Sequence, residues 1–266
     1  MQLVLDDFKD QKPSRVLYGT PRDLLRDGRD DPVRWTVGDR MARGSTDCFL
    51  IGRGFSRTDE TLAKIAESGA CSMAINNYPR DWKPDLWLTG DPPNYFGRWI
   101  WDDPTVQKFV PFETIDMPCP REDVDAPVVK PRDCPNVHFY HATTNCDPNE
   151  FFDRPYISWG TTADGPDDKD HPHGGVRSSM ISSFRVLFHL GFKRVFLVGC
   201  DFTPHTHPDP FYYEDLAGQL KVLRTVFDSH GLEVLNTNFD SHLRVFDFLP
   251  LDEAIRCSSP KQEILS

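Results

Sequence analysis

The stretch that most constrains the fold of this chain is residues 47–56, Asp-Cys-Phe-Leu-Ile-Gly-Arg-Gly-Phe-Ser. Its four consecutive apolar residues predict a parallel strand whose two faces are both buried. Gly52 and Gly54 then allow the backbone to turn sharply and to approach a ligand closely. A helix is predicted directly afterwards, with Ser56 or Thr58 as its cap. Strand, glycine turn and helix start together indicate an anion-binding site.

This glycine turn favours a phosphate or a mononucleotide over a dinucleotide cofactor. The dinucleotide fingerprint Gly-x-Gly-x-x-Gly requires a third glycine, and this chain has Arg57 in that place. Arg53 lies between the two glycines, where its guanidinium would add a bidentate contact to a phosphate. A purely structural turn with a solvated arginine is the alternative interpretation.

Composition and charge argue against several classes of protein. Of the 266 residues 30 are basic and 41 acidic, and the net charge of −11 argues against binding nucleic acid by broad charge neutralisation. No apolar run reaches the roughly 18 residues of a membrane span, and the acidic start does not resemble a signal peptide. The seven cysteines include no Cys-x-x-Cys pair, which suits a reduced compartment. We therefore expect a cytoplasmic protein, with Cys48, Cys71 and Cys200 in its core.

Apolar periodicity predicts the other elements of the fold. Strands are expected at residues 70–77, 84–91, 194–199 and 233–235, isolated strands at 106–112 and 137–140, and helices at 178–190 and 214–230. Gly191 and Gly231 follow the two helices and are expected to end them. This alternation is typical of an α/β fold, here a Rossmann-like, doubly wound and mostly parallel sheet.

The chain divides by texture into an extension, a domain and a tail. Residues 1–46 are charged and rich in turn residues, which predicts an extension packed on the core. Residues 47–250 are expected to form the nucleotide-binding domain, and residues 251–266 a C-terminal tail. Within the domain, residues 92–173 are rich in prolines and aromatic residues, and an inserted lid is expected there.

Polar residues stand where the predicted strands end. Open parallel sheets bind ligands at the carboxyl ends of their strands, so these residues are candidates for one ligand site. They are Asn76, Asn77, Asp91, Asp201 and Asn236. An amide would recognise a ribose or a base edge, and a carboxylate would bind a hydroxyl or a divalent cation, or act in catalysis. A simple turn-forming role is the alternative for each.

Histidines gather in two loops that are expected at the same edge of the sheet. They are His171 and His173 in the first loop, and His205 and His207 in the second. One interpretation is a general base, with His205 or His207 in that role. A Zn²⁺ site formed by this cluster is another, although the spacing matches no diagnostic ligand pattern. Ordinary loop histidines are the third.

A second anion site is predicted where a glycine pair leads into a helix. Gly174 and Gly175 precede Ser178 and Ser179, and backbone amides with hydroxyl groups at a helix start suit an anion. Tyr212 is a candidate for a hydroxyl contact to a phosphate, with a place in the core as the alternative.

The order of these motifs resembles a family of transferases. Gly-Arg-Gly-Phe-Ser is similar to the Gly-x-Gly-Pro-Ser loop of the bacterial CMP-sialic acid-dependent sialyltransferases (glycosyltransferase family 42) and of the related Maf-like and 6-hydroxymethylpterin diphosphokinase (MptE-like) proteins. Asn76 and Asn77 stand where those proteins carry an asparagine, and residues 84–91 look like their Pro-Asp strand. Residues 174–201 are similar to their glycine-serine helix and Leu-x-Gly-x-Asp-Phe strand, and residues 236–243 to the segment that closes the nucleotide pocket.

The resemblance covers about residues 48–102 and 174–250 and implies a CMP-type donor bound across the strand ends. The roles that it implies are phosphate binding for Gly52, Gly54 and Ser56, nucleoside binding for Asn76 and Asn77, and base catalysis for His205 or His207.

Three functions remain open at this stage. The first is a metal-independent glycosyltransferase that takes a nucleotide sugar and a small-molecule or glycan acceptor. The second is a diphosphotransferase of the pterin type, with Mg²⁺ held by Asp91 or Asp201. The third is a non-catalytic nucleotide-binding protein. None of them involves nucleic acid or a membrane span, and all are compatible with a homo-oligomer.

Overall fold

The structure is a computed structural model, and it describes residues 46–123, 125–140, 142–143, 148–152, 157–158, 178–204, 207 and 211–258. The strands are β1 (Asp47–Ile51), β2 (Cys71–Ile75), β3 (Leu86–Leu88), β4 (Gln107–Pro111), β5 (Val137–Tyr140), β6 (Ala142–Thr143), β7 (Ile157–Ser158), β8 (Arg194–Val198), β9 (Glu233–Asn236) and β10 (Asp247–Phe248). The α-helices are α3 (Asp59–Ser68), α4 (Arg98–Asp102), α5 (Ser179–His189), α6 (Tyr212–His230) and α7 (Leu251–Ser258). Short 3₁₀ helices are η1 (Pro93–Tyr95), η2 (Phe112–Thr114), η3 (Pro131–Asp133) and η4 (Pro148–Glu150).

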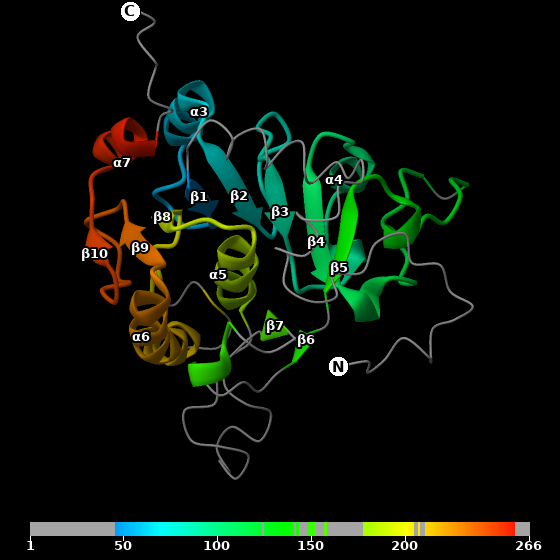
Figure 1. Cartoon of the computed structure of the whole chain (residues 1–266). Coiled ribbons are helices and arrows are strands. Elements are labelled where there is room, and N and C mark those ends of the chain that lie inside the picture. Colours follow the sequence, from blue (N-terminus) through cyan, green and yellow to red (C-terminus); the bar gives the residue numbers. More distant parts are fainter. Residues whose placement is uncertain are drawn as a thin grey trace, which may run out of the picture.

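One eight-stranded sheet organises the molecule, and all its neighbouring strands are parallel (Figure 1). The strand order is β10-β9-β8-β1-β2-β3-β4-β5, and β6 and β7 form a separate parallel pair. The chain builds outward from β1 to β5 and then returns to the other side of β1 with β8, β9 and β10. The order therefore reverses between β1 and β8, which confirms the predicted Rossmann-like, doubly wound arrangement.

The central strand β1 is buried on both faces, as its sequence predicts. Cys48 and Leu50 belong to a hydrophobic cluster that includes side chains from α5 and α6. Phe49 and Ile51 belong to a second cluster with side chains from α3, α4 and α7. Successive strand residues point to opposite faces, so helices cover both sides of the sheet.

Local sequence signals set the helix ends. Thr58 caps α3, because its hydroxyl accepts a hydrogen bond from the backbone N–H of Thr61 at 3.1 Å. Gly191 and Gly231 follow α5 and α6 with φ angles of 94° and 69°, a conformation that glycine adopts most easily. Both glycine ends agree with the prediction, and the capping role falls to Thr58 rather than to Ser56.

Part of the interval 92–173, expected as an inserted lid, belongs to the main sheet. β4 pairs with β3 and β5 pairs with β4, so these strands extend one edge of the sheet. The aromatic residues of this interval have a packing role, because Trp101 and Phe139 are fully buried in the cluster on the α4 face. The strands and α4 therefore continue the core and do not lie over it as a lid.

The expected C-terminal tail also begins with a packed element. α7 carries Ala254, which is fully buried in the same cluster. Asp252 of α7 accepts a hydrogen bond from Lys64 of α3 at 3.3 Å. The segment 251–258 is thus part of the helical layer on this face of the sheet.

A buried lysine joins the segments that lead into β4 and β5. Lys108 is fully buried, and its ammonium group donates hydrogen bonds to the carbonyls of Asp103, Val106 and Pro135. Burial lowers the pKa of Lys108 from 10.5 to about 8, and the negative charge of Asp103 opposes the shift. The side chain thus joins the segments that precede β4 and β5, and burying its positive charge is the unfavourable part of this arrangement.

Replacing Lys108 with methionine should change the pH dependence of stability. Between about pH 8 and 10.5 the unfolded chain keeps a proton on this lysine that the folded protein has released, so rising pH favours the folded state. We expect the unfolding free energy of the wild type minus that of Lys108→Met to rise across this window by up to roughly 3 kcal/mol. Urea unfolding of both proteins in pH steps measures this difference, and a difference independent of pH would contradict the assignment.

Candidate functional site

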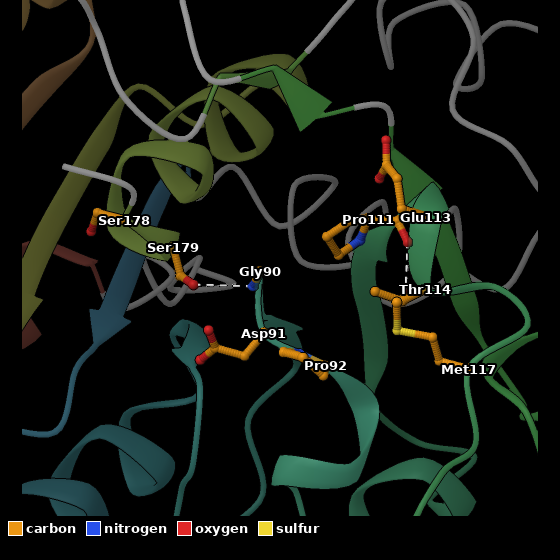
Figure 2. A pocket seen from close by; sticks show the side chains of 9 residues that line it. All are labelled: Gly90, Asp91, Pro92, Pro111, Glu113, Thr114, Met117, Ser178 and Ser179. Atoms are coloured by element: carbon orange, nitrogen blue, oxygen red, sulfur yellow. Dashed lines mark hydrogen bonds between the residues drawn. The ribbon is translucent and has the colours of Figure 1, made fainter. Parts of the chain in front are cut away.

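A pocket of about 340 Å³ lies at the carboxyl ends of β3 and β4. Figure 2 shows the segment after β3 and the start of α5 on one side, and the segment after β4 on the other. The lining residues are Gly90, Asp91, Pro92, Pro111, Glu113, Thr114, Met117, Ser178 and Ser179. Small-molecule pockets span about 300 to 1,000 Å³, so this one suits a small ligand or one part of a larger ligand.

Hydrogen bonds join the start of α5 to the ends of β2 and β3. The Ser179 hydroxyl accepts from the Gly90 N–H at 3.1 Å and donates to Asn76 Oδ1 at 3.2 Å. Asn76 Oδ1 also accepts from the Thr89 hydroxyl at 3.1 Å. Asn76 has a left-handed backbone with φ of 59°, which asparagine tolerates better than most residues. These contacts give one wall of the pocket a fixed shape.

A tyrosine and a histidine lie beside the helix start. Ser178 caps α5 by accepting from the N–H of Met180 at 3.2 Å. Tyr212 is hydrogen-bonded to Ser178, and the ring of His207 stacks on the ring of Tyr212 at 3.8 Å between centroids. Burial raises the pKa of Tyr212, the bond with Ser178 opposes this, and the charge of Asp91 adds to it. The predicted residue Tyr212 thus contacts a residue that lines the pocket, and the predicted residue His207 lies against Tyr212.

Two arginines and a carboxylate supply charge at the same edge of the sheet. Partial burial raises the pKa of Asp91, and the nearby positive charge of Arg53 opposes that shift. Arg53 is exposed and forms no ion pair with any other residue that the structure describes. Arg57 donates to the carbonyls of Gly52 at 3.2 Å and Asn77 at 2.9 Å, and burial lowers its pKa. Arg53 is therefore the cation that is available to a ligand beside Asp91.

The glycine loop after β1 is closed by the neighbouring strand β8. The Gly54 N–H donates to the Gly199 carbonyl at 2.6 Å, and the Ser56 hydroxyl accepts from the Gly199 N–H at 2.9 Å. A β-carbon at Gly54 would lie 2.8 Å from the Gly199 carbonyl oxygen and would overlap the carboxylate of Asp201. This close approach of two backbones requires a glycine at position 54 whether or not a ligand is bound.

The carboxylate of Asp201 holds three strand ends together. It accepts from the Ser56 N–H at 2.8 Å, from the Ser56 hydroxyl at 2.6 Å and from Asn238 Nδ2 at 2.7 Å. Asp201 is 1% exposed. We call Gly54, Ser56, Gly199, Asp201 and Asn238 the Asp201 network. Its polar groups are engaged within the protein, which indicates a positioning role for Asp201 and Ser56.

The sequence-predicted site residues fall into separate groups. Those near the pocket are Arg53, Asn76, Asp91, Ser178, Ser179, His207 and Tyr212, whereas the carbonyl of Asn77 accepts from Arg57, which also bonds to Gly52 of the glycine loop. Those tied together at the ends of β1 and β8 are Gly52, Gly54, Ser56 and Asp201. Asn236 is far from the pocket, because β8, β1 and β2 separate its strand from β3, but its Oδ1 accepts from the N–H of Asn238 at 3.0 Å and so adjoins the Asp201 network. His205, Gly174, Gly175, His171 and His173 lie outside the described residues.

The described part of the structure contains no cluster of side chains that supports the metal-binding predictions. Among the residues that the structure describes, no group of three or more His, Cys, Asp or Glu side chains could hold a metal ion. Asp91 and Glu113 both line the pocket, but they stand on opposite sides and do not point toward each other (Figure 2). Three of the four histidines named for Zn²⁺ lie outside the described ranges, so that prediction is not tested.

Several residues at the pocket are not singled out by the sequence pattern. Thr89, Glu113, Thr114 and Met117 follow strands that sequence periodicity does predict. The signal that found Asp91, a polar residue just after a buried strand, could also have found Thr89, Glu113 and Thr114, whereas Met117 carries no such signal. The dinucleotide fingerprint marks Arg57 only as a missing glycine, although an arginine at the carboxyl edge of a sheet is itself a candidate anion contact.

Fold and pocket together define an α/β protein with a parallel sheet and a small-ligand pocket at its carboxyl edge. Comparison with protein-family models, with curated proteins and with solved structures gives no match for this chain. The resemblance to the sialyltransferase-like family therefore stays a prediction based on the order of motifs. None of the helices in the described ranges combines the length and the apolar character needed to cross a bilayer.

Alanine at position 54 should destabilise the protein. Its β-carbon would collide with the Gly199 carbonyl and the Asp201 carboxylate, and we expect a loss of about 1–3 kcal/mol. Gly218→Ala is the matched control, because Gly218 lies inside α6 and a β-carbon added there would meet no atom within 4 Å. Alanine at position 218 should raise the unfolding free energy by about 0.5–1 kcal/mol. Thermal and urea unfolding measure both, and equal stability of the two variants would contradict the packing argument.

Proposed function

We propose that the protein is a transferase that uses a nucleotide-activated donor, a nucleotide sugar of the CMP type, bound at the pocket beside β3 and β4. The observation that carries this proposal is the charge around the pocket. Arg53 lies close to Asp91, and the capped start of α5 forms part of the wall. An arginine and a helix N-terminus both favour a phosphate, while a carboxylate beside them favours hydroxyl groups.

The proposed ligand places its phosphate toward Arg53 and its hydroxyl groups toward Asp91 and Asn76. The oxygen of the Asn76 amide accepts from Thr89 and Ser179, and its Nδ2 group donates to none of the residues that the structure describes. This group is thus a donor for a ribose or sugar oxygen. The volume of about 340 Å³ supports one mononucleotide-sized ligand part rather than a dinucleotide.

A transfer by direct displacement requires a base for the acceptor hydroxyl and a cation for the leaving phosphate. The position of His207, stacked on Tyr212 beside Ser178, supports His207 as the base. Arg53 would stabilise the leaving phosphate. Asp201 has a positioning role in this proposal, because its carboxylate already accepts three hydrogen bonds from the Asp201 network.

The carboxylate of Asp91 supports a second candidate function, a Mg²⁺-dependent diphosphotransferase. Mg²⁺ is commonly bound by one or two carboxylates together with substrate phosphates, so a single Asp91 at a phosphate pocket suits it. Asp201 does not suit this role while its oxygens accept from Ser56 and Asn238. A non-catalytic nucleotide-binding protein would use the same pocket without turnover.

A thermal-shift panel of CMP, UDP, GDP, ATP and pterins, each with and without Mg²⁺, tests these functions together. The glycosyltransferase proposal predicts stabilisation by CMP without metal, and a ligand at 100 times its dissociation constant adds about 2.7 kcal/mol. Stabilisation only by ATP and Mg²⁺ would favour the diphosphotransferase. Absence of any shift would contradict nucleotide binding altogether.

Replacing Arg53 with alanine should weaken nucleotide binding. A lost charge-assisted hydrogen bond costs about 1.5–3 kcal/mol, so the dissociation constant for CMP should rise roughly 10- to 100-fold. Arg256→Ala is the control, since Arg256 is exposed on α7 and its replacement removes the same charge outside the pocket. Calorimetric titration measures both affinities, and equal affinities in the two variants would show that Arg53 does not contact the phosphate.

Replacing His207 with alanine should lower turnover and leave nucleotide affinity nearly unchanged. Loss of a general base costs about 10²–10⁴-fold in rate. Single-turnover transfer assays together with calorimetric titration separate the two quantities. Retained turnover in His207→Ala with loss in His205→Ala would move the base to His205, and lost nucleotide affinity in His207→Ala would instead make it a binding residue.

A further inference from the structure

Two cysteines lie together in the connection between β4 and β5. The thiols of Cys119 and Cys134 lie close enough for each to shift the pKa of the other. The surrounding backbone fixes both residues, because the Cys119 N–H donates to the Val129 carbonyl at 2.8 Å and the Cys134 thiol contacts the Lys130 carbonyl at 3.3 Å. Both side chains pack against the same hydrophobic cluster. These contacts bring Cys119 and Cys134 into the same small region of the connection, although they are 15 positions apart in the chain.

We propose that Cys119 and Cys134 form a reversible disulfide by exchange with a small disulfide such as oxidised glutathione, and that this bond tethers one wall of the pocket. The inference goes beyond the proposed transferase function and does not depend on it. Cys119 follows Met117 closely in the chain, and Met117 lines the pocket together with Glu113 and Thr114. A bond from Cys119 to Cys134 would join that wall to the segment that enters β5.

The exchange requires one accessible thiol that ionises readily and a second thiol that attacks afterwards, and the environments of Cys134 and Cys119 differ in this way. The hydrogen bond from Cys119 lowers the pKa of Cys134, burial opposes this, and the positive charge of Arg98 lowers it again. Cys134 is also the half-buried member of the pair, whereas Cys119 is 3% exposed and its pKa is raised. Cys134 is therefore the thiolate that meets the reagent, and Cys119 is the resolving thiol.

The exchange consists of two displacements. The Cys134 thiolate attacks one sulfur of glutathione disulfide, which forms a mixed disulfide and releases one glutathione thiolate. Cys119 then loses its proton to solvent and attacks the Cys134 sulfur, which breaks the mixed bond and releases the second glutathione. The two cysteines are oxidised by two electrons, and the glutathione disulfide is reduced to two thiols.

A second cysteine pair in the same chain provides a matched control. Cys48 and Cys71 are opposite each other in the register of β1 and β2. Burial raises the pKa of Cys48, and both residues are almost completely buried, at 0% and 2% exposed. A pair that is close but out of reach of the reagent should stay reduced in the folded protein.

The test equilibrates the full-length protein with defined ratios of reduced and oxidised glutathione, followed by acid quench and peptide mapping without reduction. We expect a crosslinked peptide pair containing Cys119 and Cys134, while Cys48 and Cys71 remain free thiols. In Cys119→Ser the glutathione adduct should accumulate on Cys134, because the resolving thiol is absent. In Cys134→Ser the buried Cys119 should stay unmodified. Near-ultraviolet circular dichroism checks that both variants are folded.

The opposite results would overturn the proposal. A wild-type protein that carries glutathione on Cys134 without any internal crosslink would show that the two thiols do not meet. A pair that remains reduced when the exposed Cys257 is fully modified would show that Cys134 is not reactive. A CMP thermal shift measured on the oxidised and reduced forms is a separate readout, so failure of nucleotide binding leaves the crosslink result intact.

Discussion

The hydrogen bonds to the buried carboxylate of Asp201 are the interaction on which the carboxyl edge of the sheet depends. A buried charge is costly unless its hydrogen-bonding capacity is met, and here Ser56 and Asn238 supply the donors from the segments that follow β1 and β9. The turn that aims Asp201 includes Phe202 with φ of 52°, a conformation that a bulky side chain rarely adopts. The hydrogen bonds of Asp201 offset this backbone strain. As a result, side chains of the protein itself fill the point between β1 and β8 where the strand order reverses.

The closure divides the carboxyl edge into two regions with different tasks. At β1 and β8 the backbones approach so closely that Gly54 has no room for a side chain. Beyond the paired ends of β3 and β4 lies the pocket, where Asp91 is exposed and the start of α5 forms part of the wall. Arg53 belongs to the closed loop and lies near enough to Asp91 for its charge to oppose the raised pKa of that carboxylate. The shape of this edge therefore depends on a network whose polar groups are hydrogen-bonded within the protein.

The sequence was sufficient to predict elements that local residues determine, such as the apolar strand at 48–51 and the end of α6 at a glycine. It was not sufficient for the role of the glycine loop, because a close approach to Gly54 has the same sequence signature whether a phosphate or Asp201 makes it. The pocket could not be predicted as a whole, since Met117 and Ser179 meet only through the order of strands in the sheet. Prolines and aromatic residues at 92–173 were equally ambiguous, because they fill a core as readily as they form a lid.

The position of β1 also has a consequence for how the chain assembles. Its partner on one side, β2, follows after a single helix, but its partner on the other side is β8, and the paired residues Asp47 and Arg194 are 147 positions apart. Closing so long a loop costs entropy before the contact is made, which slows folding. Until β8 has been synthesised, β1 presents an open apolar edge of the kind that pairs with other chains. The growing polypeptide, rather than the finished fold, is thus the form most exposed to aggregation.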